Sequence, residues 1–174
     1  MKYTIGIDLG GTNIVAGLAD EQYRLLDKAA VKTQPEKGFD YITDNMARLV
    51  DTLLQRAKLT PADVGSIGIG SPGTPDIETG SIIFSNNLNW HDVPLAAAVR
   101  QKTGIRTWVA NDADCAALGE FVAGAAAENT SMALITIGTG VGLSLIHIWP
   151  APAVCRGGCR AGSPGSAPAL FRRC

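Results

Sequence analysis

The chain has 174 residues, 46% hydrophobic and 18% charged, enough for one domain with a hydrophobic core or for one domain and part of another. No apolar run approaches the roughly 20 residues of a membrane-spanning helix, and the first apolar run starts at Tyr3, so we expect a cytoplasmic protein without a membrane partner. The net charge is −1, but residues 1–142 carry −5, and this mildly acidic body argues against nucleic acid as the main partner.

Three short apolar runs near the start predict an antiparallel meander of strands. Tyr3–Asp8 and Ile14–Ala19 are joined by a glycine-rich turn, and Arg24–Val31 follows as a weaker strand. From Gly38 to Lys58 the apolar residues recur at spacings of three and four, which predicts an amphipathic helix.

Strands and helices then alternate. The predicted elements are a strand over Val64–Gly70, a helix that Asp92 caps and that ends at Gly104, a strand over Thr107–Ala110, a helix over Asp114–Gly124 and a strand over Ala133–Ile137. A meander followed by alternating strands and helices predicts an α/β fold, in which a mixed sheet carries helices on its faces.

Two glycine-rich turns that follow strands suit the binding of phosphate. Glycines let a phosphate approach the backbone N–H groups, and short polar side chains add donors. The first turn consists of Gly10, Gly11, Thr12 and Asn13, and the second contains Gly138, Thr139 and Gly140. Asp8, just before the first turn, is a candidate ligand for a hydrated Mg²⁺. The alternative for each turn is a purely structural tight turn.

The segment from Gly68 to Gly73 fits the pattern G-x-G-x-x-G, which also occurs in dinucleotide-binding folds. That interpretation requires a helix to begin at the loop, and Pro72 and Pro75 with the polar run to Ser81 show no helical periodicity. We therefore predict a rigid loop that presents backbone groups to a small ligand.

Four ordered motifs resemble the ROK family of bacterial sugar kinases, its glucokinases in particular. They are "IGIDLGGTNIVAGLAD", "IGIGSPGTPDIETGSIIFSNNLNW", "VANDADCAALGE" and "ITIGTGVG". The resemblance covers residues 1–142 and implies a ribonuclease H-like (actin-like ATPase) fold of two lobes. The first lobe would span residues 1–124, and residues 125–142 would begin a truncated second lobe. ATP and Mg²⁺ are the implied cofactors, and a homo-oligomer is expected for the parent protein.

The resemblance assigns Asp112 as the catalytic base, since Asn111-Asp112 matches an Asn-Asp pair of the family. Independently, a carboxylate at the end of a strand lies where α/β sheets build their sites, and it can take the proton of an attacking hydroxyl. The alternative is that Asp112 only caps the following helix. Asp114 is a possible rival cap.

The resemblance also assigns the sugar contacts. Gly73 and Thr74 match a loop over the sugar ring, Asn87 matches an asparagine near the sugar, and Asn111 should hold a hydroxyl beside Asp112. Trp90 is expected in the core, His91 in solvent and Cys115 in packing.

The last stretch, residues 143–174, differs from the rest. It holds four arginines, no acidic residue and three of the four cysteines, whereas residues 1–142 carry a net charge of −5. We expect a disordered tail. "LSLIHI" (Leu143–Ile148) is the translation of CTGTCTCTTATACACATC, a transposon end used in sequencing libraries, so an adapter-derived tail is the favoured interpretation; a divergent natural tail is the alternative. The zinc site that the resemblance implies for the second lobe is absent, since His147, Cys155 and Cys159 lack its spacing.

These features favour ATP-dependent phosphorylation of a hexose, with glucose as the expected substrate and this truncated chain inactive by itself. N-acetylated hexosamines, fructose and allose remain alternative sugars. The family also implies a sugar-responsive repressor as an alternative, although the first strand leaves no room for a helix-turn-helix ahead of it. An ATPase of the actin or chaperone type is a third hypothesis, which leaves "SPGTP" and "ANDAD" unexplained.

Overall fold

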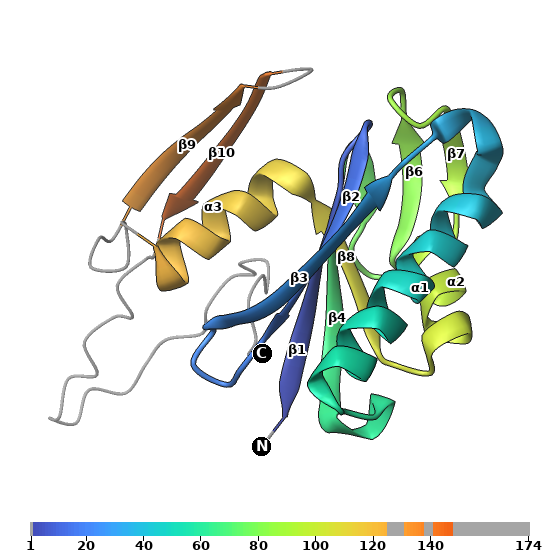
Figure 1. The fold of residues 1–174 in the computed structure, drawn as a ribbon. Helices are drawn as coiled ribbons and strands as arrows, with labels where there is room; N and C mark the ends of the chain where they lie inside the picture. The colour runs from blue at the N-terminus through green and yellow to red at the C-terminus, as the bar shows by residue number, and fades with distance from the viewer. Residues whose placement is uncertain (1, 125–130, 138–140, 148–174) are drawn as a thin grey trace, which may run out of the picture.

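A five-stranded mixed sheet forms the centre of the computed structural model, which describes residues 2–124, 131–137 and 141–147 (Figure 1). Its strands lie in the order β3-β2-β1-β4-β8. β1 pairs antiparallel with β2, and β2 with β3, whereas β4 runs parallel to both β1 and β8. The bounds are β1 Tyr3–Leu9, β2 Asn13–Ala19, β3 Leu25–Lys32, β4 Val64–Ser71 and β8 Thr107–Asn111. The predicted mixed sheet is confirmed.

Helices cover both faces of this sheet: α1 (Gly38–Ala57) and α2 (Leu95–Thr103) lie on one side, and α3 (Asp112–Ala123) on the other (Figure 1). The alternation of β1 sends Ile5, Ile7 and Leu9 toward α1, where all three are buried. The matching stripe on α1 includes Ile42, Met46 and Leu53, also buried. The periodicity that predicted α1 is therefore the pattern that builds the core.

Two short 3₁₀ turns flank the long helix, Pro35–Lys37 before it and Pro61–Asp63 after it. In the second turn, whose N-cap residue is Thr60, the carboxylate of Asp63 accepts hydrogen bonds from the Thr60 N–H at 2.8 Å and from its hydroxyl at 2.7 Å. Within the described residues no helix is long and apolar enough to cross a membrane.

A second, three-stranded sheet occupies the segment that the sequence predicted as loop. Its strands β5 (Thr74–Asp76), β6 (Ser81–Ser85) and β7 (Trp90–Val93) pair antiparallel in chain order. The strands have only three to five residues, too few to show an alternating pattern, and Pro72 and Pro75 obscure them further. The absence of a helix after Gly73 agrees with the rejection of a dinucleotide-binding loop.

Two predicted helix starts were wrong. Asp92 lies within β7 and does not cap α2, which begins at Leu95 with Pro94 at the N-cap. α3 begins at Asp112, two residues before the predicted start, because Asn111 provides the cap.

The last described strands form a separate antiparallel pair, β9 (Ser131–Ile137) with β10 (Val141–His147), beside α3 (Figure 1). The structure thus differs from the expectation that disorder begins at Leu143, because Leu143–His147 belong to β10. The buried Ser144 hydroxyl donates to the Asp114 carboxylate at 2.7 Å, which joins this strand to α3. The remainder of the predicted tail, 148–174, lies outside the described residues.

Candidate active site

The predicted site residues gather where the three parallel strands β1, β4 and β8 end. The register aligns Asp8 with Gly70 on the neighbouring strand and Gly70 in turn with Ala110. One residue further, Ser71 lies opposite Asn111. The carboxyl edge of parallel strands is where α/β sheets form binding sites, because loops diverge there and leave space for a ligand. Asp8 and Asn111-Asp112 therefore meet at one edge although about 100 residues separate them in the sequence.

The first glycine turn links β1 to β2 and is held closed by backbone bonds. The Gly10 N–H donates to the Asn13 carbonyl at 2.9 Å, and a Cβ on Gly10 would lie 2.9 Å from that same oxygen. The Gly11 and Thr12 N–H groups have no backbone partner among the described residues. A closed turn with two N–H groups that lack a backbone partner has the geometry of an anion-binding turn; its binding of phosphate stays a prediction.

Thr33, which sequence analysis missed, stabilises this turn through two hydrogen bonds. Its hydroxyl donates to the Gly10 carbonyl at 2.6 Å, its N–H donates to the Thr12 carbonyl at 2.9 Å, and the residue is fully buried. The contact joins positions 23 residues apart, so no local pattern could have indicated it.

Asp8 and Asp112 are electrostatic neighbours. Burial, and after it the negative charge of Asp112, raise the pKa of the Asp8 carboxyl above its ordinary value of 3.8. Gly70 permits this proximity, because a Cβ there would already touch the Asp112 Cα and the Cys115 Cβ, each at 3.4 Å. Two carboxylates that destabilise each other provide a favourable place for a cation.

The donor set fits Mg²⁺ bound mainly through water and phosphate. No group of three or more His, Cys, Asp or Glu side chains that could hold a metal occurs in the part of the chain that the structure describes. Mg²⁺ commonly takes only one or two carboxylates together with waters and substrate phosphates. Asp8 suits that role because it lies two residues before the first glycine turn and its carboxyl feels the charge of Asp112.

Asn111, rather than Asp112, is the cap of α3. The Asn111 Oδ1 accepts from the Ala113 N–H at 2.9 Å and from the Asp114 N–H at 3.3 Å. Within the part of the chain that the structure describes, the hydrogen bond that the Asp112 carboxylate accepts comes from the adjacent Ala113 N–H, at 2.9 Å. The structure thus assigns the capping role to the residue before Asp112, and the alternative that Asp112 is merely the cap loses its support.

The loop of Gly73 and Thr74 lies against the same helix start. The Asn111 Nδ2 amide donates to the Gly73 carbonyl oxygen at 3.1 Å. Gly73 has φ = 106°, and a Cβ there would overlap the Phe84 carbonyl oxygen. Thr74, the next residue, is exposed at the start of β5. The two halves of the predicted sugar site are therefore in direct contact.

The structure places Asn87 beside the first glycine turn. Its Cβ lies 3.9 Å from the position that a Cβ on Gly11 would occupy. Asn87 is exposed in the turn between β6 and β7, so this turn lies against the first glycine turn. The second predicted phosphate turn, Gly138, Thr139 and Gly140, lies outside the described residues, as do Cys155 and Cys159.

Neighbouring residues have structural roles. Trp90 is buried and packs edge-on against Phe39, with ring centroids 5.2 Å apart, so it belongs to the core. His91 is exposed and contacts the Phe84 ring. Cys115 is exposed, which differs from the expected packing role; it lies beside Gly70, and partial desolvation, followed by the charges of nearby carboxylates, raises the pKa of its thiol.

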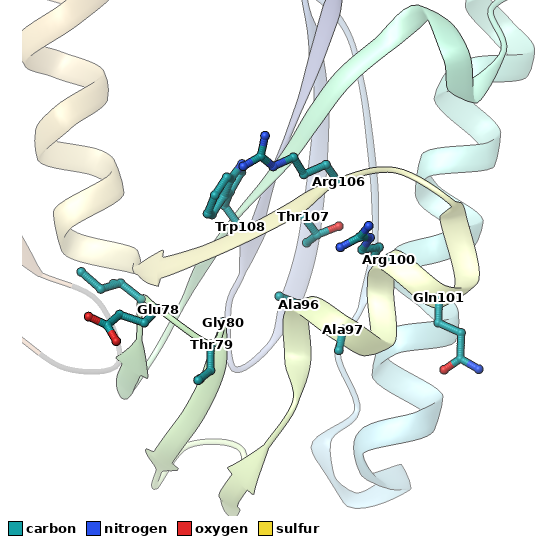
Figure 2. Close-up of a pocket in the computed structure, with 11 residues that line it drawn as sticks. Glu78, Thr79, Gly80, Ala96, Ala97, Arg100, Gln101, Arg106, Thr107 and Trp108 are labelled. Atoms are coloured by element: carbon teal, nitrogen blue, oxygen red, sulfur yellow. The ribbon is translucent and has the colours of Figure 1, made fainter. Parts of the chain in front are cut away.

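A cavity of about 520 Å³ lies apart from this site, between α2, the turn before β6 and the start of β8 (Figure 2). Arg100 extends from α2 toward it, and Arg106 covers the Trp108 ring with its guanidinium carbon 4.4 Å from the ring centroid. The lining includes none of the residues predicted to bind sugar or phosphate.

Comparison with known proteins supports the resemblance seen in the sequence. The family model described as "ROK family" matches residues 4–151, which extends past Gly142. The glucokinase of Halalkalibacterium halodurans is 35% identical over 145 residues, which cover 83% of this chain and 44% of that protein. The xylose repressor of Caldicellulosiruptor bescii is 30% identical over 149 residues, covering 82% of this chain and 36% of the repressor.

A solved structure agrees with the fold. The crystal structure of a ROK family glucokinase from Streptomyces griseus in complex with glucose and AMPPNP has a TM-score of 0.76 and 36% identity; the match covers 83% of this chain and 44% of that one. The described lobe is thus of the actin-like ATPase type. The chain spans less than half the length of the curated relatives it matches.

Proposed function

Because this chain belongs to the ROK family, we propose that it forms the sugar- and phosphate-binding lobe of an ATP-dependent hexose kinase, with glucose as its substrate. The observation that carries the proposal is the meeting of three features at one sheet edge. These are the closed turn with free N–H groups at Gly11 and Thr12, the Asp8–Asp112 pair, and the Gly73 loop joined to Asn111.

Asp112 acts as the general base. Its carboxylate takes the proton of the sugar hydroxyl as that oxygen attacks the γ-phosphate in line with the leaving group. The position favours this role because Asn111 caps the helix, so the Asp112 side chain is not needed for capping.

The first glycine turn binds nucleotide phosphate through the Gly11 and Thr12 N–H groups, with Thr12 and Asn13 side chains beside them. Asp8 holds Mg²⁺ through water, and the cation supplies charge neutralisation to the transferring phosphate. Gly138, Thr139 and Gly140 form the second phosphate turn in this proposal.

Sugar recognition rests on Gly73, Thr74, Asn87 and Asn111. Both acceptor positions of the Asn111 amide oxygen are used by N–H groups of α3, and one N–H of its nitrogen is used by Gly73. Counting the partners among the described residues, Asn111 has one N–H left to donate to a ligand. A site built from such committed polar groups discriminates strongly against analogues that lack the matching hydroxyl.

The xylose repressor relative makes a sugar-responsive repressor the second candidate. A sugar sensor requires the sugar contacts but not a base beside a magnesium ligand, and the Asp8–Asp112 proximity therefore favours the kinase. N-acetylated hexosamines, fructose and allose remain candidate substrates, since recognition in the relatives extends over a length that this chain does not span.

The test is a coupled kinase assay with glucose, N-acetylmannosamine, fructose, allose and no sugar. Two proteins are assayed: the chain alone, and residues 1–142 continued by the second half of the Halalkalibacterium halodurans glucokinase. We expect the chain alone to be a poor kinase, because kinases of this architecture close two lobes over the substrate to exclude water. The continued protein should phosphorylate glucose preferentially.

Asp112→Asn in the continued protein should lower turnover about 10²–10⁴-fold while sugar binding persists. Asp114→Asn is the matched control, because it removes the same charge from the same helical turn. Equal turnover in the two variants would refute the assignment of the base. ATP hydrolysis that ignores sugar would instead favour an actin-type ATPase, and salt-sensitive DNA binding without kinase activity would favour the repressor.

A further inference from the structure

Asn111 uses both ends of its side-chain amide within the protein. The oxygen accepts the N–H groups of Ala113 and Asp114 at the start of α3, and the nitrogen donates to the Gly73 carbonyl at 3.1 Å. The orientation of the amide is unambiguous, because a flipped amide would set its NH₂ against two N–H donors and its oxygen against a carbonyl. We name these three hydrogen bonds the amide bridge.

Capping alone does not explain an asparagine at this position. Asp and Ser cap a helix as well as Asn does, and Thr nearly so, since each offers an oxygen to the free N–H groups. Only the amide combines that acceptor with a donor on the opposite side, where the Gly73 carbonyl lies. The bridge to Gly73 is therefore the feature that distinguishes Asn from the other capping residues.

The far end of the bridge is fixed. Gly73 adopts a positive φ of 106°, and its backbone packs so closely on β6 that a Cβ would lie 2.9 Å from the Ser85 Cα. Its carbonyl oxygen is thus presented by a turn that has little freedom to move. The near end is equally defined, because Asn111 pairs with Ser71 at the edge of the central sheet. The bridge joins two sheets.

Asp112, the proposed base, directly follows Asn111 in the chain, so the hydrogen bonds that fix Asn111 also fix the backbone of Asp112. We propose that Asn111 is a positioning residue, which keeps Asp112 at a constant distance from the Gly73–Thr74 loop so that the sugar and the base are aligned. This inference rests on the proposed function, since the distance matters only if the loop binds the substrate whose proton Asp112 removes. A misplacement of about 1 Å in such a pair costs about 10²-fold in rate.

The test uses the 174-residue chain, isotope-labelled for solution NMR, with glucose as the probe. In the wild-type protein the Asn111 side-chain amide protons should exchange slowly, and the nitrogen should show scalar coupling to the Gly73 carbonyl carbon across the hydrogen bond. Asn111→Asp keeps the capping oxygen and loses the donor. Asn89→Asp is the matched control, because it places the same charge on an exposed turn of the same lobe.

Asn111→Asp should unfold at a lower denaturant concentration than Asn89→Asp, because it loses the hydrogen bond to Gly73 and sets a carboxylate oxygen toward that carbonyl. Only Asn111→Asp should also lose exchange protection at the Gly73 and Thr74 amides. In the continued protein, Asn111→Asp should lower turnover at saturating glucose roughly tenfold or more relative to Asn89→Asp, because the base is displaced, whereas loss of a direct sugar contact alone would raise KM. A merely structural role would change stability without this separate loss of turnover.

Two results would overturn the inference while the proposed function stands: no coupling to Gly73 in the wild-type protein, or equal turnover at saturating glucose in the Asn111→Asp and Asn89→Asp variants of the continued protein. A wild-type chain that shows the coupling but binds neither glucose nor the other candidate sugars would refute the proposed function. The positioning role would fall with it, and the bridge would remain only a contact between helix and loop.

Discussion

Replacing Gly73 with alanine tests whether the candidate sugar loop is held rigidly. The same substitution at two other glycines separates the cost of a positive φ from the cost of steric overlap. Gly73 has φ = 106° and no room for a Cβ, since that atom would overlap the Phe84 carbonyl oxygen. Gly104 has φ = 72°, and a Cβ added there would meet no atom within 4 Å. Gly68, in the middle of β4, has neither a positive φ nor a neighbour within 4 Å.

The expected losses of unfolding free energy follow from these differences. Gly68→Ala should be neutral or stabilising by up to about 1 kcal/mol, because alanine loses less backbone entropy on folding. Gly104→Ala should cost about 1–2 kcal/mol for the positive φ alone. Gly73→Ala should cost about 2–5 kcal/mol, because overpacking against β6 adds about 1–3 kcal/mol to the backbone strain.

Urea unfolding of the three variants, followed by circular dichroism and extrapolated linearly to zero denaturant, measures the series. Glucose binding of Gly73→Ala should also weaken, since its carbonyl carries the hydrogen bond from Asn111. If Gly73→Ala lowers the free energy of unfolding no more than Gly104→Ala does, the loop moves to accommodate the methyl group. The rigid Gly73 position that the amide bridge requires would then be refuted.

Three further outcomes are expected. The pKa of the Asp8 carboxyl is raised, so the folded protein binds the Asp8 proton more tightly than the unfolded chain does. The stability that this proton contributes is complete below the unfolded pKa and is lost as pH rises through the folded pKa. Asp8→Asn should therefore gain stability over the wild type as pH rises from about 3 to 7, and a stability difference that stays constant with pH in urea titrations would contradict this. Thr33→Val leaves the Gly10 carbonyl without its hydroxyl partner, so it should lower the free energy of unfolding by about 1–2 kcal/mol and weaken ATP binding, both measurable by calorimetry. Unchanged ATP affinity would show that the first glycine turn does not bind the nucleotide. Because burial and then neighbouring carboxylates raise its thiol pKa, Cys115 should react with iodoacetamide at pH 8 more slowly than a free thiol in a short peptide, as peptide mass spectrometry would show; an equal rate would argue against that environment.

Elements with many residues in one periodic pattern were predictable. The helix over Gly38–Ala57 buries an apolar residue every three or four positions, and the hairpin of β1 and β2 alternates around a glycine turn. Such patterns are averages over many side chains, so no single contact changes them. The short strands β5 to β7 have no such redundancy, and whether their backbone pairs depends on partners that only the folded chain supplies.

Helix ends show the same division at the scale of one residue. Asp92 and Asn111 are both good capping residues, yet only Asn111 caps a helix, while Asp92 lies in a strand. A side-chain oxygen can cap whichever N–H groups the fold brings to it, so the residue type alone does not select the helix.

The order of the residues was sufficient to determine the mixed sheet, the glycine turn after the first strand and the family to which the chain belongs, because these depend on patterns repeated along the chain. Only the tertiary structure decided that Asn111 rather than Asp112 caps α3, that Thr33 supports the first turn, and that Asp8 and Asp112 come together beside Gly70. Each of these depends on how residues far apart in the chain are brought together, including the Gly73 carbonyl that orients the Asn111 amide. The strength of such contacts is set by distance and burial, which no local pattern of residues encodes.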